Sequence, residues 1–273
     1  MNGTIQDEET AHVATERGSI IYLEGVTVDF DGFKALRDLN FIVNYHELRV
    51  VIGPNGAGKT TLLDVISGKA KPQSGRVIFG KDQDLLPLRE NQIAALGIGR
   101  KFQTPSVFGN LTVWENLELS VKRASKGVFA TLWAKATRQE TERIESGLVT
   151  IGLKDKRGSR AGALSHGEKQ WLEIGMVLLQ DPALLLVDEP VAGMTDQETE
   201  QTGQLLLSLA DKHSIIVIEH DMEFVRQIAR TVTVLHEGTV LCEGPVEKIQ
   251  SDPRVMEIYL GRKKDKKENA PAR

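Results

Sequence analysis

A glycine-rich segment carries the clearest chemistry in this sequence. Between an apolar run and a helical pattern stand residues that match G-x-x-x-x-G-K-[ST]: Gly53, Pro54, Asn55, Gly56, Ala57, Gly58, Lys59 and Thr60. In such a loop the backbone N–H groups turn inward around phosphate oxygens, and the N-terminus of the following helix adds a partial positive charge. The pattern predicts a nucleotide-phosphate site in which Lys59 reaches the β- and γ-phosphates and the Thr60 hydroxyl binds Mg²⁺. The adjacent Thr61 belongs to the same expected binding set.

Two acidic residues follow a second apolar run. Residues 184–187 lead directly into Asp188 and Glu189. If this run is a parallel strand, its carboxyl end lies beside the phosphate loop, where ligands of open α/β sheets bind. Asp188 is then suited to hold Mg²⁺ through water, and Glu189 to polarise the attacking water in phosphoryl transfer. Adjacent acids are also common in solvated turns, so this prediction depends on the phosphate loop beside them.

The elements that must position these residues alternate between strands and helices. Strands are predicted at residues 22–28, 39–43, 48–52, 76–79, 183–187, 215–218 and 231–235, and helices at 59–67, 196–210 and 222–229. Residues 104–164 read as mostly helical and more polar, and another helix follows Gly167 as far as Asp181-Pro182. This order predicts a mostly parallel sheet with covered faces, into which a helical block is inserted as a second structural unit.

Composition excludes several classes of protein. The 273 residues are 40% hydrophobic and 26% charged, as in ordinary globular domains. The one cysteine, Cys242, allows no intrachain disulfide, and no apolar run approaches the ~20 residues of a membrane span. The net charge of −4 argues against a dedicated nucleic-acid partner.

The two ends of the sequence differ from the rest. Residues 1–19 lack apolar periodicity and a secretion signal, and are predicted to form a disordered tail. Residues 262–273 hold six Lys or Arg against two Asp or Glu. This basic tail is predicted to be a solvated end, or alternatively to contact anionic lipid or a partner.

A third motif shows which family the chain resembles. Leu164-Ser165-His166-Gly167-Glu168-Lys169-Gln170 is similar to the LSGGQ signature of the ATP-binding subunits of ABC transporters. A signature of this kind is a helix N-terminus that offers the Ser165 hydroxyl and backbone N–H groups, with Gly167 among them, to phosphate. The same residues also fit a capping box, with Ser165 as N-cap and Glu168 at the third helical position. The two interpretations are compatible, because one geometry can serve both.

Further residues stand at functional positions of that family. The resemblance, which covers residues 20–261, assigns Gln103 to the Q-loop, with a role in catalysis and Mg²⁺ binding. It assigns His220 as the catalytic switch histidine and Phe30 as the aromatic ring that stacks on adenine. Taken alone, a single histidine is more often structural and a single phenylalanine more often packs in a core.

Two positions depart from the general family pattern. His166 replaces a glycine of the signature, and Thr195 stands where the D-loop usually has Asp. The first bears on contact with the γ-phosphate, and the second on communication between two ATP sites. Gly167 is retained, so close backbone approach to phosphate is still expected.

The resemblance implies the fold and its division into domains. The expected fold is α/β, a P-loop NTPase (RecA-like) core with a mostly parallel sheet, an antiparallel β subdomain and an inserted helical subdomain. The ABC ATPase domain would span residues 20–261, with the core at 20–103 and 172–261 and the helical subdomain at 104–171. ATP and Mg²⁺ are the implied cofactors.

A narrower resemblance concerns the cargo. Residues 97–103, 172–175, 218–222 and 259–261 are similar to importer ATPases for branched-chain amino acids and amides. Leu164-Ser165-His166-Gly167 together with residues 190–196 further resembles the urea-importer ATPases of the UrtD type. The main expectation is therefore an ATPase that powers import of urea or short amides. Its alternatives are branched-chain amino-acid import and lipopolysaccharide export.

The resemblance also implies partners and a location. The expected partners are two transmembrane permease subunits, a sister ATPase subunit (a heterodimer, or else a homodimer) and, indirectly, a periplasmic substrate-binding protein. The subunit would lie on the cytoplasmic face of a bacterial inner membrane. Two other classes are weaker candidates: a soluble ABC ATPase of DNA repair or translation, and a subunit that binds ATP without hydrolysing it. Glu189 and His220 argue against the second of these.

Overall fold

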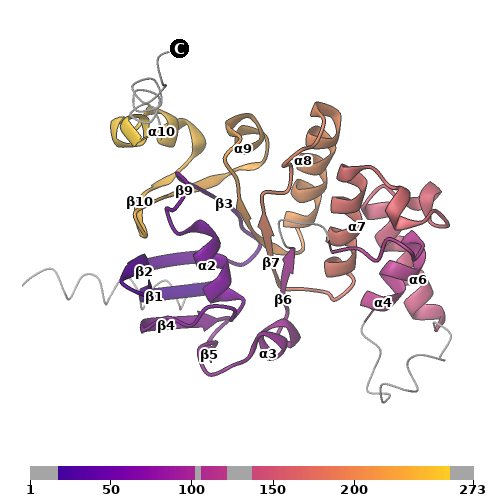
Figure 1. Cartoon of the computed structure of the whole chain (residues 1–273), viewed down its shortest axis with the longest axis horizontal. Helices are drawn as coiled ribbons and strands as arrows, with labels where there is room; N and C mark the ends of the chain where they lie inside the picture. Colours follow the sequence, from indigo (N-terminus) through magenta and orange to yellow (C-terminus); the bar gives the residue numbers. More distant parts are fainter. Residues whose placement is uncertain (1–17, 102–105, 122–136, 259–273) are drawn as a thin grey trace, which may run out of the picture.

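The computed structural model describes residues 18–101, 106–121 and 137–258, and within these ranges the chain forms two β-sheets with helices around them (Figure 1). One sheet is antiparallel, with strand order β2-β1-β4-β5. Its strands are β1 (Ser19–Phe30), β2 (Phe33–Asn44), β4 (Ser74–Phe79) and β5 (Gln83–Asp84). The predicted antiparallel subdomain is thus confirmed. β1 already begins at Ser19, which is buried, whereas residues 1–17 of the predicted tail lie outside the described residues.

The second sheet is the mostly parallel core, with strand order β10-β9-β3-β8-β7-β6. Its strands are β3 (Leu48–Ile52), β6 (Ile98–Lys101), β7 (Leu184–Asp188), β8 (Ser214–Ile218), β9 (Thr231–His236) and β10 (Thr239–Gly244). Neighbouring strands pair in parallel from β9 through β3, β8 and β7 to β6, and β10 at one edge pairs antiparallel to β9. The central strands are continuous apolar runs because both faces of this sheet are covered.

Two hydrophobic clusters cover those faces. On one face, α2 (Lys59–Ile66) and the antiparallel sheet pack against side chains such as Val51 and Ile216. On the other, side chains such as Val50 and Val217 meet helices α7 (His166–Leu178), α8 (Asp196–Ala210), α9 (Met222–Ile228) and α10 (Val246–Ser251). The alternation along each strand therefore sends successive residues to opposite clusters.

A third cluster is the core of the helical block. It packs α4 (Val113–Ser120) and α6 (Arg138–Thr150) against α7, at the right of Figure 1. Two 3-10 turns, Lys154–Lys156 and Ala161–Ala163, lead back to α7. Leu172 of α7 lies in this third cluster, whereas Ile174 lies in the cluster beneath the parallel sheet. Because α7 runs without a break through position 172, the same helix packs in the core of the helical block and against the parallel sheet.

Several short elements were not predicted, and some predicted ends shift. The unpredicted elements are α3 (Glu90–Ala95), β5, β6, β10 and α10. The helix expected to reach Asp181-Pro182 ends at Leu178, and most strands extend one or more residues beyond their predicted ends. No helix in the described ranges is long and apolar enough to cross a membrane.

Leu172→Ala should destabilise the protein strongly. The side chain extends from α7 into the core of the helical block and is fully buried there. A large-to-small change at such a site lowers the free energy of unfolding by about 2–5 kcal/mol, through lost contacts and the cavity that remains. Leu207→Ala, on the exposed side of α8, is the matched control and should cost far less. Chemical denaturation of both variants measures the difference, and equal losses would contradict the shared role of α7.

Candidate active site

The register of the parallel sheet brings three chain segments to one edge. Val51 of β3 pairs with Ile218 of β8, which in turn pairs with Asp188 of β7. These three residues form one row across neighbouring strands, and the chain leaves the sheet just beyond it in all three. The phosphate loop, Glu189 and His220 therefore emerge side by side at the carboxyl edge, the usual ligand position in such sheets.

Two glycines of the phosphate loop let neighbouring backbone come close. Gly58 has a φ of 100°, and a Cβ there would lie 2.5 Å from the Ala35 carbonyl oxygen of β2. A Cβ on Gly53 would overlap the Leu235 carbonyl oxygen of β9. Any larger residue at either position would displace β2 or β9, so the loop keeps its shape only with glycine there.

The start of α2 differs from the starts of the other long helices. Its N-cap is Gly58, which has no side chain to bond the first N–H groups of the helix. By contrast, capping side chains accept from first-turn N–H groups in α4, α6, α7, α8 and α9. The first N–H groups of any helix lack intrahelical acceptors. At α2 no capping side chain competes with an outside anion for these groups.

Lys59 lies folded against this loop. It is the first residue of α2 and is buried, and its Nζ donates to the carbonyl oxygens of Gly53, at 2.7 Å, and Pro54, at 3.2 Å. The ammonium group is thus held beside the first N–H groups of α2. A buried cation next to the N-terminus of a helix makes a strong site for a phosphate group.

Glu189 and His220 face each other. His220 Nδ1 is 3.5 Å from Glu189 Oε1, and the Glu189 amide donates to the Ile218 carbonyl at 3.0 Å. Glu189 has a φ of 45°, a backbone conformation that non-glycine residues adopt rarely and that often marks functional sites. The His220 side chain is 62% exposed, so it is not a core histidine and can contact a ligand at this edge.

Asp188 is buried beside them at the end of β7, with 5% exposure. Burial raises the pKa of Asp188, and the nearby Arg100 guanidinium partly offsets this effect. Arg100 in turn donates to Asp64 of α2 at 2.7 Å, which fixes β6 to the helix that follows the phosphate loop. A carboxylate short of solvent gains from a bound cation, so the chemistry of Asp188 suits Mg²⁺.

Thr60 and Asp188 fit a metal that arrives with its nucleotide. Thr60 is exposed at the start of α2. Asp188 ends β7, which lies two strands from β3, the strand that leads into the phosphate loop. Among the described residues, no group of three or more His, Cys, Asp or Glu could hold a metal. Mg²⁺ commonly takes one or two protein ligands together with phosphates and water, and these two residues suffice for that.

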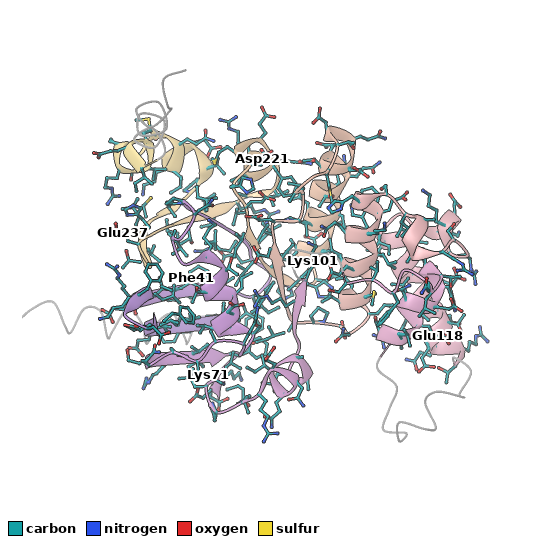
Figure 2. All side chains as sticks on the ribbon, in the orientation of Figure 1. Phe41, Lys71, Lys101, Glu118, Asp221 and Glu237 are labelled. Carbon is teal, nitrogen blue, oxygen red and sulfur yellow. The ribbon has the colours of Figure 1, made fainter. Side chains whose placement is uncertain are left out.

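Three buried charges that the sequence did not reveal lie under the site. Lys101 of β6 is fully buried in the interior of the molecule (Figure 2). The charges of Glu173 of α7 and of Glu219 act on it there. Burial lowers the pKa of Lys101, while the surrounding carboxylates oppose the change. Burial likewise raises the pKa of Glu173 and of Glu219. Glu219 also accepts the His220 amide at 2.8 Å, so it positions the histidine backbone.

The signature residues lie at the start of α7. Ser165 is the N-cap, and Ser165 and Glu168 form the predicted capping box: each side chain accepts from the other's backbone N–H. The Ser165 hydroxyl also donates to Glu198 of α8, at 2.8 Å. Among the hydrogen bonds of the described residues, none joins Ser165 to the phosphate loop. The structure thus groups the phosphate loop, Asp188, Glu189 and His220, and leaves Ser165 and Gly167 against α8.

Three predicted site residues remain: Phe30, Gln103 and Thr61. Phe30 at the end of β1 is 52% exposed, which contradicts the core interpretation and leaves its ring available for stacking. Gln103 lies outside the described residues. Thr61 is half-buried on α2 next to Thr60.

The family is decided by comparison with known proteins. A family described as "ABC transporter" matches residues 36–192, which is more than half of the chain. The chain belongs to the ABC transporter ATP-binding family. A second family, "Branched-chain amino acid ATP-binding cassette transporter", matches residues 239–265. The chain is therefore an ABC ATPase of the branched-chain amino-acid importer type, and the narrower urea specificity does not follow from these matches.

Curated relatives agree over nearly their whole length. The high-affinity branched-chain amino acid transport ATP-binding protein LivG of Escherichia coli K12 is 34% identical over 250 residues, with 89% of this chain and 98% of LivG covered. The corresponding BraF protein of Pseudomonas aeruginosa is 32% identical, with the same shares covered.

Solved structures agree in fold. A nucleotide-free ATP-binding cassette from an ABC transporter has a TM-score of 0.78 and 30% identity over 88% of this chain and 98% of its own. An ADP-bound cassette has a TM-score of 0.79 at 30% identity, with 89% and 99% covered. The predicted fold class of this ABC ATPase is thereby confirmed.

Lys59→Ala should weaken ATP binding by at least about tenfold. The variant loses a cation whose hydrogen bonds to phosphate contribute about 1.5–3 kcal/mol each. Titration with a fluorescent ATP analogue measures the affinity. Lys81→Ala, which removes an exposed lysine outside the loop, should bind normally. Unchanged affinity in Lys59→Ala would remove Lys59 from the site.

Proposed function

We propose that this ABC ATPase binds and hydrolyses Mg²⁺-ATP at the edge where the phosphate loop, Asp188, Glu189 and His220 meet. The observation that carries the proposal is the row formed by Val51, Ile218 and Asp188, since it aligns all three segments. ATP would lie with its phosphates on the loop and with Phe30 beneath adenine. The exposure of Phe30 supports that stacking role.

Each side chain of the site then has one task. Lys59 leaves the loop carbonyls and binds the β- and γ-phosphates, and Thr60 and Asp188 hold Mg²⁺. Bound by these residues, Mg²⁺ would supply positive charge beside the phosphate oxygens. Glu189 orients and polarises the attacking water, and His220, 3.5 Å from Glu189, contacts the γ-phosphate from the same side. Gln103 completes the set as the Q-loop ligand.

Hydrolysis would require two ATPase subunits. Among the described residues, the hydrogen bonds of the Ser165 side chain go to α7 and α8 and not to the phosphate loop, so we expect Ser165 and Gly167 to serve ATP in another subunit. A dimeric cassette from another ABC ATPase, bound to ADP and phosphate, supports this arrangement, with a TM-score of 0.69 and 25% identity over 83% of this chain. The second subunit would be a sister ATPase or a second copy.

The ATPase would drive a transporter at a membrane. Two permease subunits would dock near the helical block and the Q-loop, and closure of the ATPase dimer would change their conformation. The complex would take cargo from a periplasmic substrate-binding protein, with the ATPase on the cytoplasmic face of a bacterial inner membrane.

Two cargoes have separate support. The names of LivG and BraF favour branched-chain amino acids, and we take that as the leading candidate. Urea or a short amide is the second candidate, because His166 and the segment Met194-Thr195-Asp196 follow the pattern of the urea-importer ATPases. Both candidates use the same ATPase chemistry.

Glu189→Gln should abolish most hydrolysis and preserve ATP binding. The amide keeps the size of the side chain but loses the charge that polarises water, so the rate should fall roughly 10²-fold or more. The variant should accumulate as an ATP-bound dimer, alone or with the sister ATPase, in light scattering with Mg²⁺-ATP. Adding Ser165→Arg should return it to monomers. Normal hydrolysis in Glu189→Gln would rule out the catalytic role, and monomers throughout would rule out the composite site.

Deletion of the gene tests the cargo. Uptake of radiolabelled leucine and of radiolabelled urea is measured at low concentration in the deletion strain and in a strain complemented with Glu189→Gln. Loss of leucine uptake alone would support the leading candidate, and loss of urea uptake alone the second. The Glu189→Gln strain should behave like the deletion, because the defect lies in ATP hydrolysis.

A further inference from the structure

One carboxylate of α8 is shared by the starts of two helices. Glu198 Oε2 accepts the Thr195 amide at 3.0 Å and the Thr195 hydroxyl at 3.1 Å, which completes the capping box of α8. Glu198 Oε1 accepts the Ser165 hydroxyl at 2.8 Å, at the start of α7. The side chain therefore joins the signature to the D-loop within one chain.

The carboxylate lies where a phosphate would approach the signature. A Cβ on Gly167 would be 2.6 Å from both Glu198 Cδ and Glu198 Oε1, so a larger residue there would push the Glu198 carboxylate from its present position. The Thr195 amide, the Ser165 hydroxyl and the Gly167 amide hold the pKa of Glu198 below its usual range. The group is thus an anion bound at the N-terminus of a 13-residue helix, the position that favours anions.

Ser165 cannot serve this carboxylate and a nucleotide together. A serine hydroxyl has one hydrogen to donate, and here it is directed to Glu198. A γ-phosphate brought by another subunit would need the same hydrogen, and would also meet the negative charge of Glu198 at close range. Occupation of the signature by ATP therefore requires Ser165 to leave Glu198.

One departure from the family pattern, Thr195, belongs to this same contact, and the other, His166, contacts the D-loop beside it. Thr195 supplies two of the donors to Glu198, and His166 Nε2 lies 3.1 Å from the Ala192 carbonyl oxygen of the D-loop. Since Thr195 keeps Oε2 bonded, Glu198 stays anchored to α8 when Ser165 departs. The contact can therefore open at Ser165 without loss of the α8 capping box.

We propose that Glu198 acts as an internal substitute for the γ-phosphate, which holds the signature until ATP in another subunit displaces it. Glu198 is a positioning residue: it sets the ATP concentration at which the composite site closes. This inference rests on the proposed role of Ser165 in that site, and it goes beyond that role by naming the group against which ATP competes.

The test compares three variants of the full chain. Glu198→Gln removes the charge but retains the capping box, which glutamine also supports. Glu198→Asp retains the charge but is one methylene too short to reach Ser165. Glu200→Gln, an exposed carboxylate on the same helix, is the charge-matched control. Thermal melting confirms that each variant is folded, and ATPase rates are measured across ATP concentrations.

Glu198→Gln and Glu198→Asp should both lower the ATP concentration for half-maximal rate, by about three- to tenfold for loss of one charge-assisted hydrogen bond. Their maximal rates should change little, and Glu200→Gln should match the wild type. A half-maximal concentration that is unchanged or raised in both folded variants overturns the inference. So does a shift in Glu198→Gln alone, which would point to long-range charge. Absence of hydrolysis by the wild type would instead overturn the proposed function.

Discussion

The close approach of three backbone segments around the phosphate loop is the constraint on which the rest of the structure depends. Gly58 leaves space for the Ala35 carbonyl of β2, and Gly53 for the Leu235 carbonyl of β9. The Arg37 amide of β2 also donates to the Gly238 carbonyl, in the turn after β9, at 2.9 Å. The antiparallel sheet, the edge of the parallel sheet and the loop are thereby fixed to one another. Because Phe30 is carried by the same antiparallel sheet, the position of an adenine platform follows from these contacts.

Buried charge beneath the site is the second feature that organises it. Lys101 and Glu173 come from β6 and α7, and burial removes solvent from both charged groups, whose opposite charges then stabilise each other. A buried pair of opposite charges adds little to the free energy of folding. Any arrangement that separates the two groups is strongly destabilised, because it leaves one charge unpaired in the interior. We therefore regard them as fixing the position of α7 relative to β6, and with it the position of the signature.

The sequence predicted local chemistry well and distant contacts poorly. The phosphate loop and the acids at the end of β7 were found because each is a compact pattern beside an apolar run. Glu198 was not found, because its partner Ser165 is 33 positions away and only the fold brings them together. β6 was missed for a related reason: two of its four residues, Arg100 and Lys101, are charged, and pairing with β7 makes it a strand. The capping box at Ser165 was predictable, whereas the second acceptor of its hydroxyl was not.

The continuity of α7 has a mechanical consequence. Its 13 residues form a rod about 20 Å long, with the signature at one end and the cluster beneath the parallel sheet at the other. The helical block is fastened to the flank of this rod through Leu172. A displacement of the helical block would therefore tilt the whole rod, and the contact between Ser165 and Glu198 of α8, at the end that carries the signature, would resist that tilt.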